Sequence, residues 1–303
     1  MKLLLTGATG YLGRHLLEAL ADTDHELILL VRAADKLKPL LQKQAAAVTV
    51  IETRDNNWKE KIRSTSPEGV IHLAAYLSSA DDEQTIDLLI DSNLRFGTHL
   101  LDALRGSPVR FFINTGTFAE YTGTTDKQLQ PAYLYAATKT AFRPVLQYYQ
   151  RLTGFRLLHV IPYTIYGRNG DAKKLIDYLY EALDAPAPVN MSPGEQVLDL
   201  IHIDDVIRFY LQLLAHPEAL TDPVSVFHLG TGTGTSPRQL AGILEKTTAK
   251  KANINWGGRP YRDLDTMYAV APPDPLAGRI GWIPAISIEQ GIQQDYNNFK
   301  RGI

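Results

Sequence analysis

The chain has 303 residues, a formal net charge of −2, 45% hydrophobic residues and 21% charged residues. This balance is ordinary for a globular protein with a sizeable core, and it lacks the basic excess expected of a nucleic-acid-binding surface. The absence of cysteine excludes disulfides, thiolate catalysis and cysteine-ligated metal, and we expect no metal site. No apolar run approaches the ~18 residues of a membrane span, so no membrane partner is expected. Because the chain begins on a strand-like run without an apolar leader, we expect a cytoplasmic protein.

The first half of the chain alternates strand-like and helix-like segments. Short apolar runs predict buried strands at residues 3–5, 26–31, 48–52, 70–74, 109–114 and 156–161. Apolar residues at helical spacing predict helices over residues 11–21, 85–105 and 133–153. Frequent proline predicts loops at 186–193 and 272–284.

This alternation is typical of a parallel sheet covered by helices on both faces. The sequence therefore predicts the α/β class, with a Rossmann-type doubly wound parallel sheet and a smaller C-terminal lobe. We place the sheet domain at residues 1–161, with a returning segment near 197–228. The smaller lobe then comprises residues 162–196 and 229–303.

A glycine-rich turn lies between the first predicted strand and helix, in the stretch from Thr6 to Gly13. The spacing is Gly-x-x-Gly-x-x-Gly, which differs from the Gly-x-Gly-x-x-Gly fingerprint of many dinucleotide-binding proteins. Glycines let the backbone turn tightly and approach a pyrophosphate, and a helix N-terminus supplies N–H groups and partial positive charge. The stretch predicts a phosphate cradle.

Two further motifs carry groups suited to proton transfer. Tyr135 and Lys139 are four residues apart, so they share one face of the predicted helix. The ammonium is expected to lower the phenol's pKa, which would let Tyr135 exchange a proton with a carbinol or carbonyl. Thr115 and Thr117 follow a predicted strand, where ligands of open parallel sheets bind.

In this order, the motifs resemble those of extended short-chain dehydrogenases/reductases of the nucleotide-sugar epimerase/dehydratase family. The resemblance covers nearly the whole chain. It rests on eight ordered segments, which are residues 6–13, 72–75, 93 with 97–98, 115–121, 135 with 139, 162–167, 199–206 and 281–284. It implies that the sheet domain binds NAD(P) and that the smaller lobe binds substrate.

The resemblance also implies roles for individual residues. Tyr135 would be the general acid/base, Lys139 would assist it and hold the nicotinamide ribose, and Thr117 would replace the family's catalytic serine. Besides Tyr135 and Lys139, the implied cofactor-binding residues are Gly7, Thr9, Gly10, Tyr11, Leu12, Gly13, Arg32, Asp55, Asn56, Leu73, Ala74, Ala75, Asn93, Pro162 and Thr164. The implied substrate-binding residues are Tyr76, Ser78, Thr115, Thr117, Tyr163, Lys174, Met191, Arg259 and Arg262.

Besides Thr117, two further positions depart from the family pattern. Arg32, in addition, bears on the choice of cofactor. Gly116 stands where a second serine is common, and Thr164 stands where asparagine is common. An NAD enzyme usually has an acidic residue after the second strand, where this chain has Arg32. Arginine suits a 2′-phosphate, which favours NADP and leaves NAD open. Arg14 and Lys36 are candidate helpers.

Within this family, the chain more specifically resembles reductases of CDP- or dTDP-4-keto-6-deoxyhexoses, such as abequose and paratose synthases. This resemblance implies that hydride passes from the nicotinamide to the sugar C4 carbonyl while Tyr135 delivers the proton. A 4-epimerase with tightly bound NAD remains open, because the same catalytic set would serve it. A non-catalytic NADP sensor or scaffold is the alternative from another class, against which the intact catalytic set argues.

The predicted helices at 85–105 and 133–153 also bear on assembly. They resemble the two helices through which many extended family members pair, and they carry more apolar residues than one face requires. A homodimer is expected, with burial under the C-terminal lobe as the alternative.

Several other features are expected to be structural. The glycine-rich segment 230–234 is expected to be a structural turn, His72 and His202 to be packed and hydrogen-bonded, and Asp204 and Asp205 to cap a helix.

Overall fold

The computed structural model describes residues 1–41, 47–121, 128–167 and 173–301. Its centre is a seven-stranded sheet in which every neighbouring pair of strands is parallel. In order across the sheet, the strands are β10 (Val224–Leu229), β6 (Arg156–Pro162), β5 (Phe111–Thr115), β4 (Gly69–His72), β1 (Lys2–Thr6), β2 (Glu26–Val31) and β3 (Val48–Glu52). The strand order reverses beside β1, which creates a crevice at the strands' carboxyl ends. The predicted doubly wound α/β fold is confirmed.

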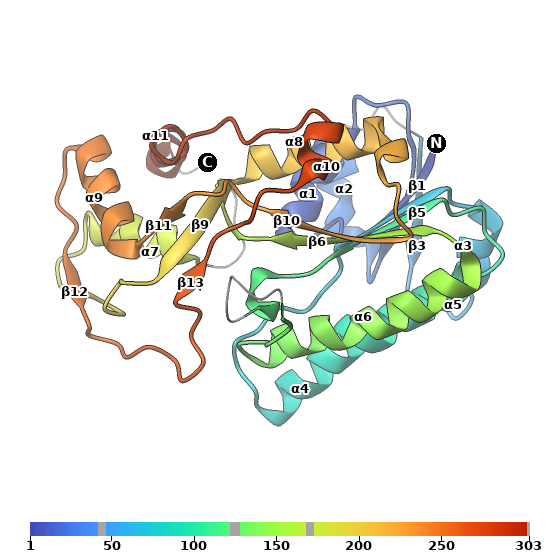
Figure 1. Ribbon diagram of the computed structural model, residues 1–303, viewed down its shortest axis with the longest axis horizontal. Coiled ribbons are helices and arrows are strands. Elements are labelled where there is room, and N and C mark those ends of the chain that lie inside the picture. Colours follow the sequence, from blue (N-terminus) through green and yellow to red (C-terminus); the bar gives the residue numbers. More distant parts are fainter. Residues whose placement is uncertain (42–46, 122–127, 168–172, 302–303) are drawn as a thin grey trace.

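Helices cover both faces of the sheet (Figure 1). One face carries α1 (Tyr11–Leu20), α2 (Lys38–Leu41) and α8 (Ile203–Ala215). The other carries α3 (Trp58–Thr65), α4 (Glu83–Ile90), α5 (Phe96–Ala103) and α6 (Leu134–Thr153). A π-helical turn, η2 (Asp91–Arg95), joins α4 to α5. The described residues also form short 3₁₀ turns, namely η1 (Ala34–Leu37), η3 (Phe118–Glu120) and η4 (Pro217–Ala219).

The apolar run of β1 explains why the sheet is buried on both sides. Leu3, Leu4 and Leu5 are each fully buried, and successive strand residues point to opposite faces. Leu3 and Leu5 belong to the core beneath α1 and α8, whereas Leu4 belongs to the core beneath α5 and α6. A continuous apolar run is the expected signature of such a doubly covered parallel strand.

Several segments of the second half of the chain form a smaller group of elements at one end of the sheet, whereas α8, β10 and α10 (Pro275–Arg279) lie on or in the large sheet (Figure 1). Its central strand β9 (Val197–His202) pairs with β7 (Thr164–Tyr166), β13 (Tyr268–Ala269) and β11 (Gly234–Thr235), and β8 (Val189–Met191) pairs with β12 (Ile254–Trp256). The remaining helices are α7 (Leu175–Ala182), α9 (Pro237–Thr248) and α11 (Ile288–Arg301). No helix of the described residues is long and apolar enough to cross a membrane.

The segment at 197–228 divides between the two parts of the molecule. β9 lies in the small sheet, α8 contacts α1, and β10 adds an edge strand to the seven-stranded sheet beside β6. The division into a sheet domain and a substrate lobe at the stated boundaries stays a prediction.

Two proline-rich segments contain regular structure that the sequence did not predict. β8 falls within 186–193, where loops were expected, because it pairs with β12 rather than with a neighbour in sequence. α10 falls within 272–284, where Pro275 occupies its first turn and the Asp274 side chain accepts a hydrogen bond from Leu276 N at 2.8 Å. Proline at the first turn of a helix costs no hydrogen bond, so its presence did not exclude a helix.

Candidate active site

The glycine turn after β1 permits close approach of three chain segments. Gly7 has φ +73°, and a Cβ added there would lie 2.6 Å from Ala74 N. A Cβ added at Gly13 would overlap Gly7 O, so α1 packs directly on the turn. Thr6 Oγ1 accepts a hydrogen bond from Ala74 N at 3.1 Å and contacts His72 Nδ1 at 2.8 Å. These contacts fix the ends of β1 and β4 on both sides of the crevice.

A cavity of about 870 Å³ opens at this point. Eight predicted site residues line it, which are Gly7, Thr9, Gly10, Arg32, Leu73, Ala74, Ala75 and Tyr76. The candidate helpers Arg14 and Lys36 also line it. The sequence analysis missed Leu30, Val31, Pro39, Leu40, Thr53, Leu88, Asp91, Ser92 and Phe96. Of these, Leu30 and Val31 end β2, so the rule that ligands bind at the carboxyl ends of strands would have pointed to them.

The chemistry of this lining fits a dinucleotide cofactor. The turn brings the N-terminus of α1 to the cavity, where backbone N–H groups and the helix dipole suit a pyrophosphate. Arg14 on α1, together with Arg32 and Lys36 beyond β2, adds positive charge to the lining. Ala74 and Ala75 form the wall beyond β4.

Other predicted cofactor residues lie away from the cavity wall. Asp55 Oδ2 pairs with Lys61 Nζ at 2.7 Å, and Thr53, rather than Asp55 or Asn56, lines the cavity. Tyr11, Leu12, Gly13, Pro162 and Thr164 are also absent from the lining. Pro162 ends β6 and Thr164 begins β7, so both lie beyond the carboxyl end of the sheet. Contacts between these residues and a cofactor stay predictions.

Asn93 joins the cavity wall to the helix that carries the predicted catalytic pair. It is buried within the π-helical turn η2, a form of helix often found at functional sites. Its Oδ1 accepts from Tyr76 N at 2.9 Å, and its Nδ2 donates to Tyr76 O at 3.1 Å and to Thr138 Oγ1 at 3.0 Å. Its amide therefore positions Tyr76 against α6, and a direct contact with cofactor stays a prediction.

Tyr135 and Lys139 lie four residues apart on α6, and both are buried. Thr117 is also buried, two residues beyond the end of β5, where it is the N-cap of η3. Thr117 Oγ1 accepts a weak hydrogen bond from Ala119 N at 3.3 Å, which leaves its proton available for donation. The Tyr135 ring stacks on Tyr133, with 5.9 Å between the centroids.

Burial sets the protonation of the two α6 side chains. It raises the pKa of the Tyr135 phenol above the usual value, with smaller contributions from Tyr133 and Glu120. It lowers the pKa of Lys139 to about 8, which Glu120 opposes and Arg143 reinforces. The expected lowering of the Tyr135 pKa is therefore wrong for this structure, because burial disfavours the charged phenolate.

The predicted substrate residues occupy both sides of the crevice. Tyr163 is buried, stacks on Phe118 at 5.8 Å between ring centroids, and approaches His228 Nδ1 with its hydroxyl at 3.2 Å. Thr115 Oγ1 lies 2.9 Å from the Tyr210 hydroxyl of α8, which gives it a structural partner. Ser78 Oγ accepts from Ala80 N at 3.1 Å in the loop after β4. Their substrate contacts stay predictions.

The remaining predicted substrate residues come from the second half of the chain. Lys174 Nζ donates to Ile165 O at 2.9 Å and lies 3.8 Å from the centroid of the Tyr11 ring. Met191 is buried in the small lobe, and its carbonyl accepts from Arg259 N at 3.1 Å. Arg262 is exposed, and its guanidinium lies 5.9 Å from the centroid of Tyr133, beside Tyr135. Arg262 thus extends from the small lobe to the catalytic helix.

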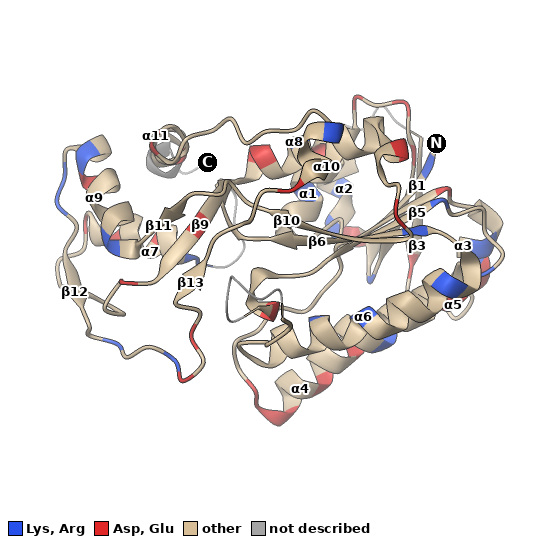
Figure 2. Ribbon diagram, viewed as in Figure 1, with Lys and Arg blue, Asp and Glu red and all other residues tan. Residues whose placement is uncertain are grey.

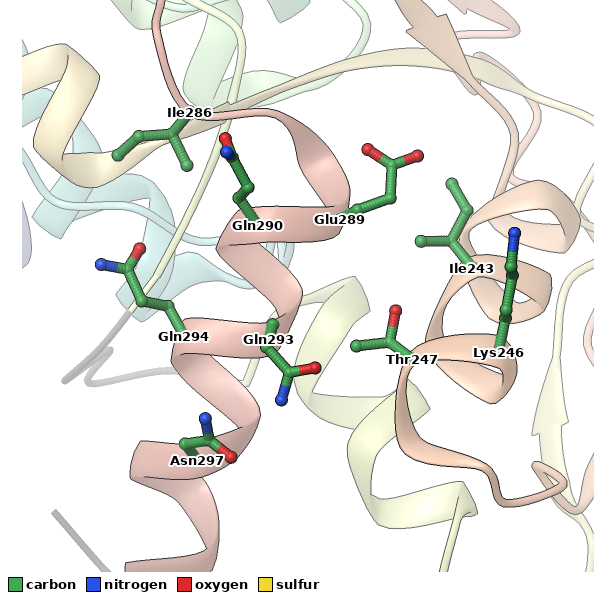
Figure 3. Close-up of a pocket in the computed structure, with 9 residues that line it drawn as sticks. All are labelled: Ile243, Lys246, Thr247, Ile286, Glu289, Gln290, Gln293, Gln294 and Asn297. Atoms are coloured by element: carbon green, nitrogen blue, oxygen red, sulfur yellow. The ribbon is translucent and has the colours of Figure 1, made fainter.

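A second hollow, of about 830 Å³, lies between α9 and α11. Side chains of the two helices face each other across it (Figure 3). Its lining is rich in amides and contains Ile243, Lys246, Thr247, Ile286, Glu289, Gln290, Gln293, Gln294 and Asn297. None of the predicted site residues belongs to this lining, which shares no residue with the lining of the crevice cavity.

Features expected to be structural have structural partners. The turn at 230–234 surrounds the buried carboxylate of Asp199, which accepts from Thr231 N and Gly232 N, each at 2.8 Å. His202 Nδ1 accepts from Asp204 N at 3.2 Å and caps α8, so the expectation that Asp204 or Asp205 caps this helix is wrong. Asp205 instead accepts from Ala285 N and Ile286 N.

The comparisons with known proteins agree with this fold and crevice. A profile of the NAD dependent epimerase/dehydratase family matches residues 3–230. The chain belongs to this family and is an NAD(P)-dependent enzyme that acts on nucleotide sugars, which confirms the predicted family and class.

Particular relatives are of two kinds. The chain is 27% identical to a CDP-abequose synthase of Salmonella muenchen over 301 residues, which cover 97% of this chain and 96% of the relative. It is 23% identical to a putative UDP-glucose 4-epimerase of Methanocaldococcus jannaschii over 316 aligned positions, covering 98% of each. A Thermus thermophilus UDP-glucose 4-epimerase, solved in complex with NAD, superposes with a TM-score of 0.82 and 24% identity over 100% of both chains.

Proposed function

We propose that this enzyme is an NADP-dependent reductase of a nucleoside diphosphate 4-keto-6-deoxy sugar. The observation that carries the proposal is its likeness to CDP-abequose synthases along nearly the whole of both chains. The side chain of Arg32 in the cofactor cavity supports NADP, because a guanidinium can bind a 2′-phosphate through two charge-assisted hydrogen bonds.

The bound nicotinamide would supply a hydride to the C4 carbonyl, and the protein's own residues would manage the proton and the orientation of the sugar. Tyr135 would hold its phenolic proton at the carbonyl oxygen and release it as negative charge develops there. Its raised pKa keeps the phenol protonated before reaction, as a general acid requires. Thr117 would donate a second hydrogen bond to the same oxygen, and Lys139 would hold the nicotinamide ribose.

The test is to incubate the protein with NADPH and a panel of CDP- and dTDP-4-keto-6-deoxy sugars while following absorbance at the reduced-nicotinamide band. We expect stoichiometric oxidation of NADPH with a CDP or dTDP keto sugar. The absence of oxidation with every member of the panel would overturn the proposal. NADH in place of NADPH serves as the cofactor control.

The second candidate is a nucleotide-sugar 4-epimerase with tightly bound NAD, which the similarity to the Methanocaldococcus jannaschii relative favours. The nucleotide released from freshly purified, denatured protein separates the candidates. Stoichiometric NAD together with interconversion of UDP-sugars supports the epimerase. NADPH binding without either reaction supports the sensor or scaffold alternative.

A further inference from the structure

Glu120 is fully buried behind the predicted catalytic residues, and the proposed mechanism does not use it. Its Oε1 accepts a hydrogen bond from Thr117 N at 2.9 Å. Its Oε2 accepts from Arg143 Nε at 2.7 Å and, more weakly, from Thr140 Oγ1 at 3.4 Å. One carboxylate therefore connects η3, which follows Thr117, to α6, which carries Tyr135 and Lys139.

Gly116 provides the space that this carboxylate occupies. A Cβ added at Gly116 would overlap Glu120 Oε1 and would lie 2.7 Å from Ile161 Cδ1. The backbone at Gly116 is not in the left-handed region, so space rather than conformation requires glycine. The Glu120 carboxylate thus occupies the space that a side chain at position 116 would need.

Arg143 extends the catalytic face of α6. Tyr135, Lys139 and Arg143 succeed one another at four-residue spacing, which places them along one side of the helix. The guanidinium is buried, and among the described residues its Nη2 has no hydrogen-bond partner. Because a buried charge without a partner is costly, Arg143 is compensated by its bond to Glu120 and by the Tyr121 ring, whose centroid lies 5.4 Å from the guanidinium carbon.

The pair acts on Lys139 with opposite signs. Glu120 raises the pKa of Lys139 and Arg143 lowers it. The other titratable groups near this site are Tyr135 on α6, Tyr121 directly after η3, His72 on β4 and His159 on β6. Burial lowers the pKa of each histidine to about 3 and raises that of both tyrosines, so all four stay neutral where Lys139 titrates.

We propose that Glu120 and Arg143 are positioning residues of this active site. Their buried pair fixes Thr117 against the Tyr135–Lys139 face and balances the charge around Lys139. The catalytic part of this inference rests on the proposed function, whereas its electrostatic part does not.

The electrostatic part is tested by NMR titration of the protein labelled at the lysine ε-carbons, with Lys139 assigned from a Lys139→Arg variant. Glu120→Gln should shift the Lys139 titration to lower pH, and Arg143→Met should shift it to higher pH. Arg151→Met, an exposed position on the same helix, is the matched control and should leave it unchanged. Shifts of the same sign in both variants, or no shift, would overturn the inference. This result does not depend on finding the substrate.

The catalytic part is tested by turnover of the keto sugar. In Glu120→Gln, kcat should fall by ~10²-fold, the scale of a misplaced reacting group, with the Kd for NADPH unchanged. Unchanged kcat in a folded Glu120→Gln protein would overturn the positioning role. If the wild-type protein turns over no keto sugar, the proposed function fails while the titration still decides the inference.

Because Gly116 and Glu120 compete for one space, a double variant at the two positions provides a second test, which distinguishes displacement of the carboxylate from a general loss of folding. Gly116→Ser should reduce kcat by displacing the Glu120 carboxylate. In the double variant Gly116→Ser with Glu120→Ala, we expect kcat above that of either single variant, because the serine then occupies the vacated space. Additive losses in the double variant would show that the two positions act independently. Where Glu120→Gln does not fold, Glu120→Gln with Arg143→Met removes both charges and replaces it in the turnover test, while Arg143→Met against the Arg151→Met control decides the titration.

Discussion

At the scale of single residues, the phenol of Tyr135 carries the first prediction. Tyr135→Phe removes the proton donor and keeps the ring that stacks on Tyr133. We expect turnover of the keto sugar to fall by ~10²–10⁴-fold, the usual loss for a general acid or base, with NADPH binding roughly intact. Tyr133→Phe is the matched control and should retain most of the activity. Near-normal turnover by Tyr135→Phe would exclude the proposed mechanism.

Arg32 carries the second prediction, which concerns cofactor choice. It is exposed and lines the cavity directly after β2. Arg32→Ala should weaken NADPH binding by ~1.5–3 kcal/mol, the range for hydrogen bonds to charged groups, and NADH binding much less. Titration calorimetry measures both affinities. Arg54→Ala, after the neighbouring β3 and outside the cavity lining, should change neither. Equal losses for both cofactors would show that Arg32 does not bind the phosphate.

For single residues, the sequence predicted which side chains line the cofactor cavity better than it predicted their protonation states. The turn at Gly7 and the basic position at Arg32 could be predicted because each has a local signature in the sequence. The raised pKa of Tyr135 could not, because it depends on burial by segments far along the chain. Glu120 was also missed, since its partner Arg143 lies 23 residues away on another element.

At the scale of elements, α8 carries the third prediction. Asp205 lies in its first turn, is fully buried, and accepts hydrogen bonds from Ala285 N at 3.1 Å and Ile286 N at 3.0 Å. It also pairs with Arg208, and its carbonyl accepts from Trp282 Nε1 at 3.0 Å. The C-terminal segment is therefore held to α8 through both the side chain and the carbonyl of Asp205, and Arg208 Nη2 adds a weak bond to Ile283 O at 3.5 Å.

Asp205→Ala should destabilise the protein by ~2–4 kcal/mol, because two backbone N–H groups lose a buried, charged acceptor. The free energy of unfolding in urea measures the loss. Asp204→Ala is the adjacent control, since Asp204 is more exposed, and it should cost under ~1 kcal/mol. A loss no larger for Asp205→Ala than for Asp204→Ala would contradict this role of the carboxylate.

The bounds of an element could be predicted where the residues that pack in the core form one continuous apolar run in the sequence. β2 and β3 have the predicted bounds, because their apolar runs end where the strands leave the core. β4 ends at His72 rather than at residue 74, since Leu73 and Ala74 leave the strand and line the cavity. The helix predicted over 85–105 is interrupted by the π-helical turn at Asn93, whose hydrogen bonds to Tyr76 and Thr138 are not encoded in its spacing.

At the scale of the whole molecule, the parallel sheet could be predicted because each strand carries its own apolar run. The strands of the small lobe were harder to predict from the sequence, because its sheets join short strands from distant parts of the chain. β7 pairs with β9, and β8 pairs with β12, across dozens of intervening residues. Strands of two or three residues show too little periodicity to be detected.

The last prediction concerns assembly. α4 and α6 lie side by side on one face of the sheet (Figure 1), and α6 carries few charged positions along its length (Figure 2). Exposed apolar side chains lie on both helices, namely Ile86 and Ile90 on α4 and Tyr148 and Leu152 on α6. The alternative of burial under the C-terminal lobe does not account for them, because they stay exposed beside the described part of that lobe. An apolar surface of this kind suits a self-complementary contact between two copies.

We therefore expect a two-fold symmetric homodimer in solution, with α4 and α6 of each copy at the interface. Light scattering at micromolar concentration should give twice the 33.7 kDa mass of one chain. Ile90→Glu with Tyr148→Glu should give the monomer, because carboxylates buried against a partner would lack compensation. Leu264→Glu, at an exposed apolar position in the second half of the chain, should leave the dimer intact. A monomeric wild-type protein would refute the assembly, and a dimer that survives the double substitution would move the interface away from these two helices.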